Sequence, residues 1–190
     1  MPKPSSSGKN PQIFSKIDIL EIVTNHLSTL RRYGSSKNSI SDLLLFCFLP
    51  LFVGICLVLF KVVLNKDLIG ILINVFAIFA GFLFNLLVLV YDAASKAVNP
   101  NNSLQANNLK LELLEQIYFN ISFEILLSLF IVILLSISIM FNSGLANSIF
   151  SAFVFFLIFS FTLTFLMVLK RVNKLLSQEI EQQKKSIQNP

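Results

Sequence analysis

Few side chains in this sequence combine into a chemical site. His26 is the only histidine, and it lies far in sequence from the two cysteines, Cys47 and Cys56. A metal site needs three or four ligands at suitable geometry, and no such spacing is present. The apolar parts of the sequence contain neither a nucleophile paired with a base nor a pair of aspartates. The sequence therefore predicts a protein that is not an enzyme and that holds no metal or cofactor.

One acidic residue lies where an acid is costly. Glu124 falls inside an apolar segment, about 10 Å along a helix from Ile117. Ionisable residues within membrane spans are rare and usually face a bundle interior or water. Ser128 follows one turn later on the same face. Two interpretations follow: Glu124 and Ser128 line the mouth or gate of a pore, or the carboxylate reaches the membrane surface and pairs with a lysine.

A second pattern combines small and amide side chains at helical spacing. Its members recur every three or four residues and are Gly70, Asn74, Ala77, Gly81 and Asn85. Asn74 and Asn85 are three helical turns apart, so they align along one face. Small residues let helices approach closely, and asparagine can hydrogen-bond between helices in a membrane. This face is predicted either to line an oligomeric pore or to pack against another helix of the same subunit.

Four long apolar runs must position these residues, at 43–64, 68–91, 121–141 and 148–169. Each is long enough to cross a bilayer as a helix, which takes about 20 apolar residues. The chain is 55% hydrophobic and 13% charged, whereas a soluble domain is about a quarter charged. We therefore predict an all-α protein, a four-helix transmembrane bundle with cytosolic helical extensions.

Six segments are expected along the chain. They are a disordered tail at 1–12, a cytosolic amphipathic helix at 13–40, a first transmembrane hairpin at 41–92, a cytosolic loop and helix at 93–118, a second transmembrane hairpin at 119–169 and a cytosolic C-terminal helix at 170–190. The apolar periodicity predicts one continuous helix over about 104–141, and it predicts that the last span continues as a helix to about 185.

The basic residues set the expected orientation. All of them except Lys61 and Lys66 fall on one side of a chain with four spans, and the formal net charge is +5. Because loops rich in Lys and Arg stay in the cytoplasm, both termini of this multi-pass chain are predicted to be cytoplasmic. The residues expected to contact lipid headgroups or an anionic ligand are Arg31, Arg32, Lys96, Lys110, Lys170, Arg171 and Lys174.

Two stretches carry a resemblance to a known kind of protein. They are residues 25–31 (NHLSTLR) before the first apolar run and residues 78–92 (IFAGFLFNLLVLVYD) at the end of the second. Both resemble small four-span bacterial membrane effectors found with anti-phage defence genes, specifically the channel subunit of Hailong-type systems. The resemblance implies a tetrameric channel, controlled by a single-stranded DNA oligomer that a partner nucleotidyltransferase makes.

The residues and the resemblance together predict a homo-oligomeric membrane channel or pore-forming effector. It would be gated on the cytosolic side and would depolarise the membrane in anti-phage defence. Its expected partners are membrane lipids, further copies of the chain with a tetramer favoured, the single-stranded oligonucleotide and the nucleotidyltransferase. Two alternatives stay open: a membrane scaffold that anchors a soluble partner, and a holin-like former of lesions.

Overall fold

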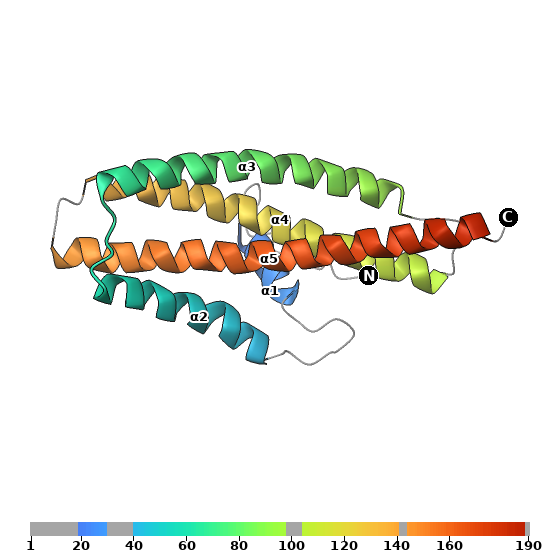
Figure 1. Ribbon diagram of the computed structural model, residues 1–190, viewed down its shortest axis with the longest axis horizontal. Helices are drawn as coiled ribbons and strands as arrows, with labels where there is room; N and C mark the ends of the chain where they lie inside the picture. The colour runs from blue at the N-terminus through green and yellow to red at the C-terminus, as the bar shows by residue number, and fades with distance from the viewer. Residues whose placement is uncertain (1–18, 30–39, 98–103, 141–143, 189–190) are drawn as a thin grey trace, which may run out of the picture.

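The computed structural model describes residues 19–29, 40–97, 104–140 and 144–188. These residues form five helices and no strand, which confirms the predicted all-α fold. The helices are α1 (Ile19–Thr29), α2 (Ile40–Leu59), α3 (Lys66–Ser95), α4 (Leu104–Ser138) and α5 (Leu145–Gln188). The four longer helices run lengthwise through the molecule, and α1 is a short helix beside them (Figure 1).

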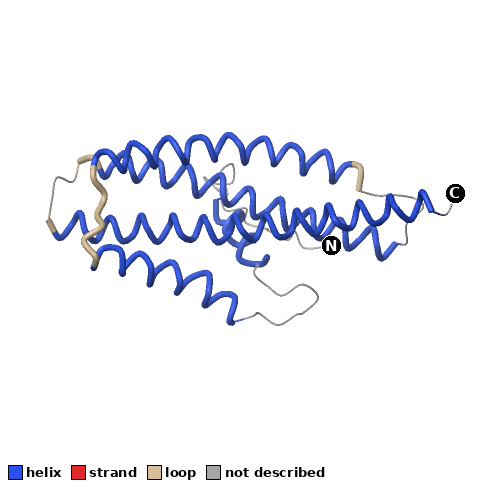
Figure 2. The backbone as a smooth tube through the Cα atoms, viewed as in Figure 1, coloured by secondary structure: helices blue, strands red, loops and turns tan. Residues whose placement is uncertain are grey.

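The helices form a row in which α4 and α5 are central. α3 packs against α4 and α2 packs against α5, while α1 packs against α4. Within the described residues, α2 and α3 have no close backbone approach although they follow one another in the chain. The turns from α2 to α3 and from α4 to α5 lie at one end of the row, which we call the hairpin end (Figure 2). The opposite end, where α5 finishes, is called the extended end.

Three helices, α3, α4 and α5, are long and apolar enough to cross a membrane. With 35 and 44 residues, α4 and α5 are about 52 and 66 Å long. The hydrocarbon core of a bilayer is only about 30 Å thick. Both helices are therefore longer than a membrane span and can extend beyond the bilayer at the extended end. The sequence predicts such continuous helices. The architecture is that of a multi-pass membrane protein.

The first apolar run differs from its prediction. The sequence predicts a span over 43–64, but α2 ends at Leu59, and its described apolar part, Phe46–Leu59, is shorter than the other three. The Val62 and Lys61 amides donate to carbonyl oxygens of the last turn of α2. These two bonds close a helix C-terminus, with Lys61 in the left-handed region at φ 62°. The helix therefore stops before the apolar residues do.

The packed side of α3 has a regular spacing. Ile69, Phe76, Leu83 and Val90 are buried and seven residues apart. Seven residues are about two helical turns, so these side chains form one line along the helix and face α4. The edge of the Phe76 ring also reaches Phe161 of α5 at a centroid distance of 5.1 Å. All of the core packing of α3 is thus made with one side.

α2 and α5 come close together at Gly54. A Cβ atom at this position would lie 2.8 Å from the carbonyl oxygen of Ala152 and 3.1 Å from the backbone nitrogen of Phe156. Both distances are shorter than an ordinary van der Waals contact, and the atoms belong to a helix backbone that cannot easily move. Glycine therefore sets the spacing between these two helices, as small residues do in membrane bundles.

Some predicted features lie outside the described residues. They are the tail at 1–12, most of the amphipathic helix predicted at 13–40 apart from 19–29, and residues 98–103 of the loop predicted within 93–118.

Candidate functional site

Four polar residues from three helices meet inside the protein. The side-chain oxygen of Asn120 in α4 lies 2.9 Å from Nδ1 of His26 and accepts a hydrogen bond from Thr29 Oγ1 at 2.6 Å. Arg171 of α5 donates from Nη2 to the Thr29 carbonyl oxygen, also at 2.6 Å. His26, Thr29 and Asn120 are buried. We call these four residues the polar cluster, and it ties α1 to both central helices.

His26 is uncharged at neutral pH in this position. Its ring stacks on Phe123, with centroids 3.9 Å apart and planes 3° from parallel. Burial lowers the pKa of His26 from 6.5 to about 4; the hydrogen bond with Asn120 opposes this shift, and the charge of Arg171 adds to it. Because the Asn120 oxygen is an acceptor, Nδ1 carries the hydrogen of the neutral ring. Docking of α1 therefore uses the neutral form of its histidine.

Glu124 lies one turn after Asn120 on α4 and has no exposed surface. The interpretation that it reaches the membrane surface and pairs with a lysine is therefore wrong. The Thr164 hydroxyl of α5 lies beside the carboxyl group, but neither carboxyl oxygen has a partner in hydrogen-bonding geometry. Ser128, one turn further, is also buried and donates to the Ile125 carbonyl oxygen. Both predicted residues therefore face the bundle interior.

Unused hydrogen-bonding groups surround the polar cluster. Among the described side chains, the buried atoms without a partner are Asn120 Nδ2, both carboxyl oxygens of Glu124, and Arg171 Nη1. The amide and guanidinium nitrogens are donors and the carboxyl group can accept, so these groups are complementary in kind. A buried polar group without a partner costs about 1–3 kcal/mol.

Towards the hairpin end the interior becomes apolar. Ile131 and Leu135 of α4 and Val154 of α5 have no exposed surface. The next buried polar side chains are engaged with backbone: Ser138 donates to the Leu135 carbonyl oxygen, and Ser151 accepts from an amide of the α2–α3 turn. The described interior of one subunit thus provides no continuous polar path from end to end.

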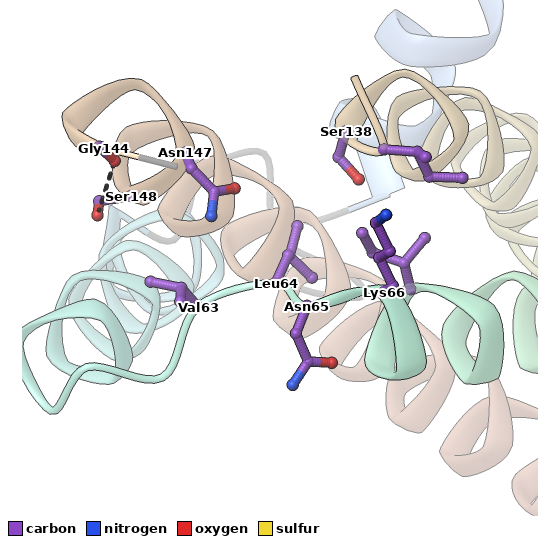
Figure 3. A pocket seen from close by; sticks show the side chains of 10 residues that line it. Val63, Leu64, Asn65, Lys66, Ser138, Gly144, Asn147 and Ser148 are labelled. Carbon is purple, nitrogen blue, oxygen red and sulfur yellow. Dashed lines mark hydrogen bonds between the residues drawn. The ribbon is translucent and has the colours of Figure 1, made fainter. Parts of the chain in front are cut away.

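A separate cavity of about 430 Å³ opens at the hairpin end, between the α2–α3 turn and the ends of α4 and α5. Figure 3 shows the Lys66 side chain, at the start of α3, extending towards Ser138, while Asn147 approaches from α5. Asn65 caps α3, since its side-chain oxygen accepts from the Leu68 amide at 2.8 Å. The cavity lies about 20 Å along α4 from the buried carboxyl group, so it is not part of the polar cluster.

The small and amide face of α3 points away from the rest of the subunit. All five residues, Gly70, Asn74, Ala77, Gly81 and Asn85, are exposed. A Cβ atom at Gly70 or Gly81 would meet nothing within 4 Å. The interpretation of this face as a packing surface within one subunit is therefore wrong. We call these five residues the α3 stripe, and it is open to lipid, water or another subunit.

The predicted basic residues that the structure describes have different environments. Arg171 belongs to the polar cluster, Lys96 pairs with Asp92 at 2.7 Å on the last turn of α3, and Lys110 of α4 pairs with Glu179 of α5. Lys170 and Lys174 are exposed residues of α5. Arg31 and Arg32 lie outside the described residues. The Lys110 pair joins the two central helices at the extended end.

The centre of the cluster, Asn120, is absent from the residues that the sequence pattern selects. A signal for it exists, because Asn120 precedes Glu124 by four residues and must share its helical face. Its partners His26 and Thr29 are more than 90 positions away in sequence, so the contact itself has no local signature.

Comparisons with known proteins identify no relative. No family model matches the chain, and neither the curated proteins nor the solved structures give a match. Within the part of the chain that the structure describes, no group of three or more His, Cys, Asp or Glu side chains could hold a metal ion. The function of the protein must therefore be inferred from its residues and their geometry.

Proposed function

We propose that this protein is a homo-oligomeric membrane channel or pore-forming effector, gated on the cytosolic side. In this proposal the protein lies in a bacterial inner membrane with both termini in the cytoplasm. It depolarises that membrane in anti-phage defence. The observation that carries the proposal is the α3 stripe, whose two asparagines are exposed on a helix that is long and apolar enough to cross a membrane.

The α3 stripe supports an assembly because lipid is a poor environment for amide side chains. Asn74 and Asn85 are about 16 Å apart along α3, so each would lie within the apolar thickness of a bilayer. A polar group left without partners in hydrocarbon costs several kcal/mol. Another copy of the chain, or water in a pore between copies, removes that cost. Gly81, between them, allows a close approach.

The polar cluster supports gating on the cytosolic side, through the docking of α1. α1 is held on α4 and α5 by a few hydrogen bonds and one ring stack, rather than by a long packed interface. A signal that binds near α1 could therefore release it at modest cost. The resemblance suggests that the signal is a single-stranded oligonucleotide made by a nucleotidyltransferase. Lys170 and Lys174 of α5 offer exposed positive charge for its phosphates.

Ion flux through liposomes that contain the purified protein tests this proposal. The variant Asn74→Leu/Asn85→Leu should change single-channel conductance or ion selectivity severalfold, since it removes both amides of the stripe. Ile71→Leu is the matched control, because Ile71 is exposed on α3 about a quarter turn from the stripe. It should conduct as the unchanged protein does.

Three outcomes separate the candidate functions. Conductance that depends on the asparagines supports the channel. A protein that conducts no ions under any condition, but forms a stable complex with a soluble partner, is a scaffold and overturns the proposal. Large lesions that pass molecules much larger than ions indicate a holin-like protein and also contradict a gated channel.

A further inference from the structure

The outer face of α5 carries a second repeat. Its positions alternate between steps of three and four residues and are Leu166, Leu169, Asn173, Leu176 and Ile180. All five are exposed, with the four apolar side chains between 49% and 55% accessible. The next position of this spacing holds the polar Gln183, and the one after it holds Ile187. An alternating step of four and three is the heptad spacing of a coiled coil.

This repeat lies on a different side of α5 from the residues that pack inside the bundle. Phe161, Thr164 and Val168 are buried against the other helices. At 100° per residue, the five repeat positions are centred about a third of a turn away from them. One face of α5 therefore holds the subunit together, while a parallel apolar face has no partner within the described chain.

Membrane lipid cannot cover the whole of this face. α5 leaves its apolar run at Lys170 and continues to Gln188, while the Lys110–Glu179 pair shows a charged environment around its later turns. Leu176 and Ile180 lie in that part and are 54% and 53% exposed. Exposed apolar rows of this kind in water mark an interface, since their burial is worth about 25 cal/mol per Å².

We infer that α5 pairs with α5 of a second copy of this chain, as a parallel two-stranded coiled coil from Leu166 to the end of the helix. Copies inserted the same way in a membrane have parallel α5 helices, so the pairing needs no rearrangement of the subunit. This inference deepens the homo-oligomer of the proposed function and names its contact.

The residue types at the repeat favour two strands. In heptad notation Leu169 and Leu176 occupy d positions, while Asn173 and Ile180 occupy a positions. Isoleucine at a with leucine at d favours dimers, and one asparagine at a fixes the register at a cost in stability. In the parallel pair, Asn173 of one copy faces Asn173 of the other. A tetramer would then need a second self-contact, and the α3 stripe is on a different helix.

The flanking charges fit the same arrangement. Glu179 is at a g position and Lys184 at the following e position. In a parallel coiled coil these positions approach each other between strands, so each side of the pair gains opposite charges. Glu179 also pairs with Lys110 of its own subunit. It therefore lies beside the apolar contact between the two α5 helices, which we call the seam, and is not buried within it.

Cysteine cross-linking of the full chain in membranes tests the seam. In a background with Cys47→Ala and Cys56→Ala, Leu176→Cys should give a disulfide-linked dimer on mild oxidation. Gln178→Cys is the matched control, because Gln178 is exposed on α5 but turned away from the repeat. Dimer yield should be about tenfold higher at position 176, since a disulfide needs Cβ atoms a few ångströms apart. Equal yields at the two positions, or none at 176, overturn the inference.

Native mass spectrometry of two further variants checks the same seam without cysteines. Leu176→Glu should remove the α5 pair while circular dichroism shows unchanged helix content, because Leu176 is exposed in the single subunit. Asn173→Leu should produce oligomers other than the unchanged protein's, because the register signal is gone. If neither variant changes the mass, the seam is wrong. Cross-linking at 176 in a protein that conducts no ions would keep the seam and reject the channel.

Discussion

Asparagines of α3 and α4 have opposite environments. Asn74 and Asn85 lie on the outer face of α3, exposed and without a neighbouring helix of the subunit. Asn120 of α4 is fully buried, and its side-chain oxygen meets both His26 and Thr29. Asparagine is thus available on α3 for contacts outside the subunit, whereas on α4 it holds α1 by hydrogen bonds.

The contrast assigns different roles to two regions of the molecule. Loss of an amide on the α3 stripe should affect what the assembled protein does and leave the single subunit intact. Loss of a group in the polar cluster should affect the subunit itself and the docking of α1. Stability and conductance therefore become separate measurements of the two regions.

The largest expected effect is the pH dependence of α1 docking. The pKa of His26 is 6.5 when α1 is free and about 4 when it is docked. A depressed pKa contributes stability that is fully present above pH 6.5 and is lost as the pH falls towards 4. The loss reaches about 3 kcal/mol at the acid end. Protease cleavage within α1, compared at pH 7.5 and 4.5 in detergent, measures the release.

His26→Gln is the control for this pH effect, since glutamine can still hydrogen-bond to Asn120 but does not titrate. Its α1 should be cleaved at similar rates at both pH values. If the unchanged protein also shows no difference, then His26 does not govern docking.

A smaller effect is expected from Asn120→Leu. This substitution removes the acceptor for Nδ1 of His26 and leaves that donor buried, at a cost of about 1–3 kcal/mol. Thermal unfolding in detergent should show the loss. Asn74→Leu is the matched change on the α3 stripe and should leave the stability of the isolated subunit unchanged within about 0.5 kcal/mol. Equal losses for the two variants would contradict the contrast between the regions.

The last comparison separates two glycines, and its Gly81→Ala member has the smallest expected effect. Gly54→Ala would place a Cβ atom 2.8 Å from a backbone oxygen of α5, which should cost about 1–3 kcal/mol by overpacking. Gly81→Ala meets nothing within 4 Å and should stabilise α3 by about 0.5–1 kcal/mol. Guanidinium or dodecyl sulfate titrations of the two variants measure the difference. A destabilised Gly81→Ala protein would indicate that the stripe is already packed against another copy.

Much of the fold could be predicted because its signals are local. The start of α4 near Leu104 and the continuation of α5 to about residue 185 both follow from apolar residues that recur at helical spacing. The end of α2 could not be predicted in this way, because the apolar sequence continues to Leu64 while capping hydrogen bonds end the helix at Leu59. Hydrophobicity gives the extent of an apolar run, and hydrogen bonds give the end of a helix.

The sequence by itself determined that the chain is all-helical, that its polar residues are few, and at which helical spacing they recur. Only the tertiary structure decided which way those residues face. The α3 stripe and the face of α4 that carries Glu124 have similar local patterns, but one is exposed and the other is buried. The physical reason is that periodicity groups residues on one side of a helix, whereas the choice of packed side depends on neighbours far away in the chain.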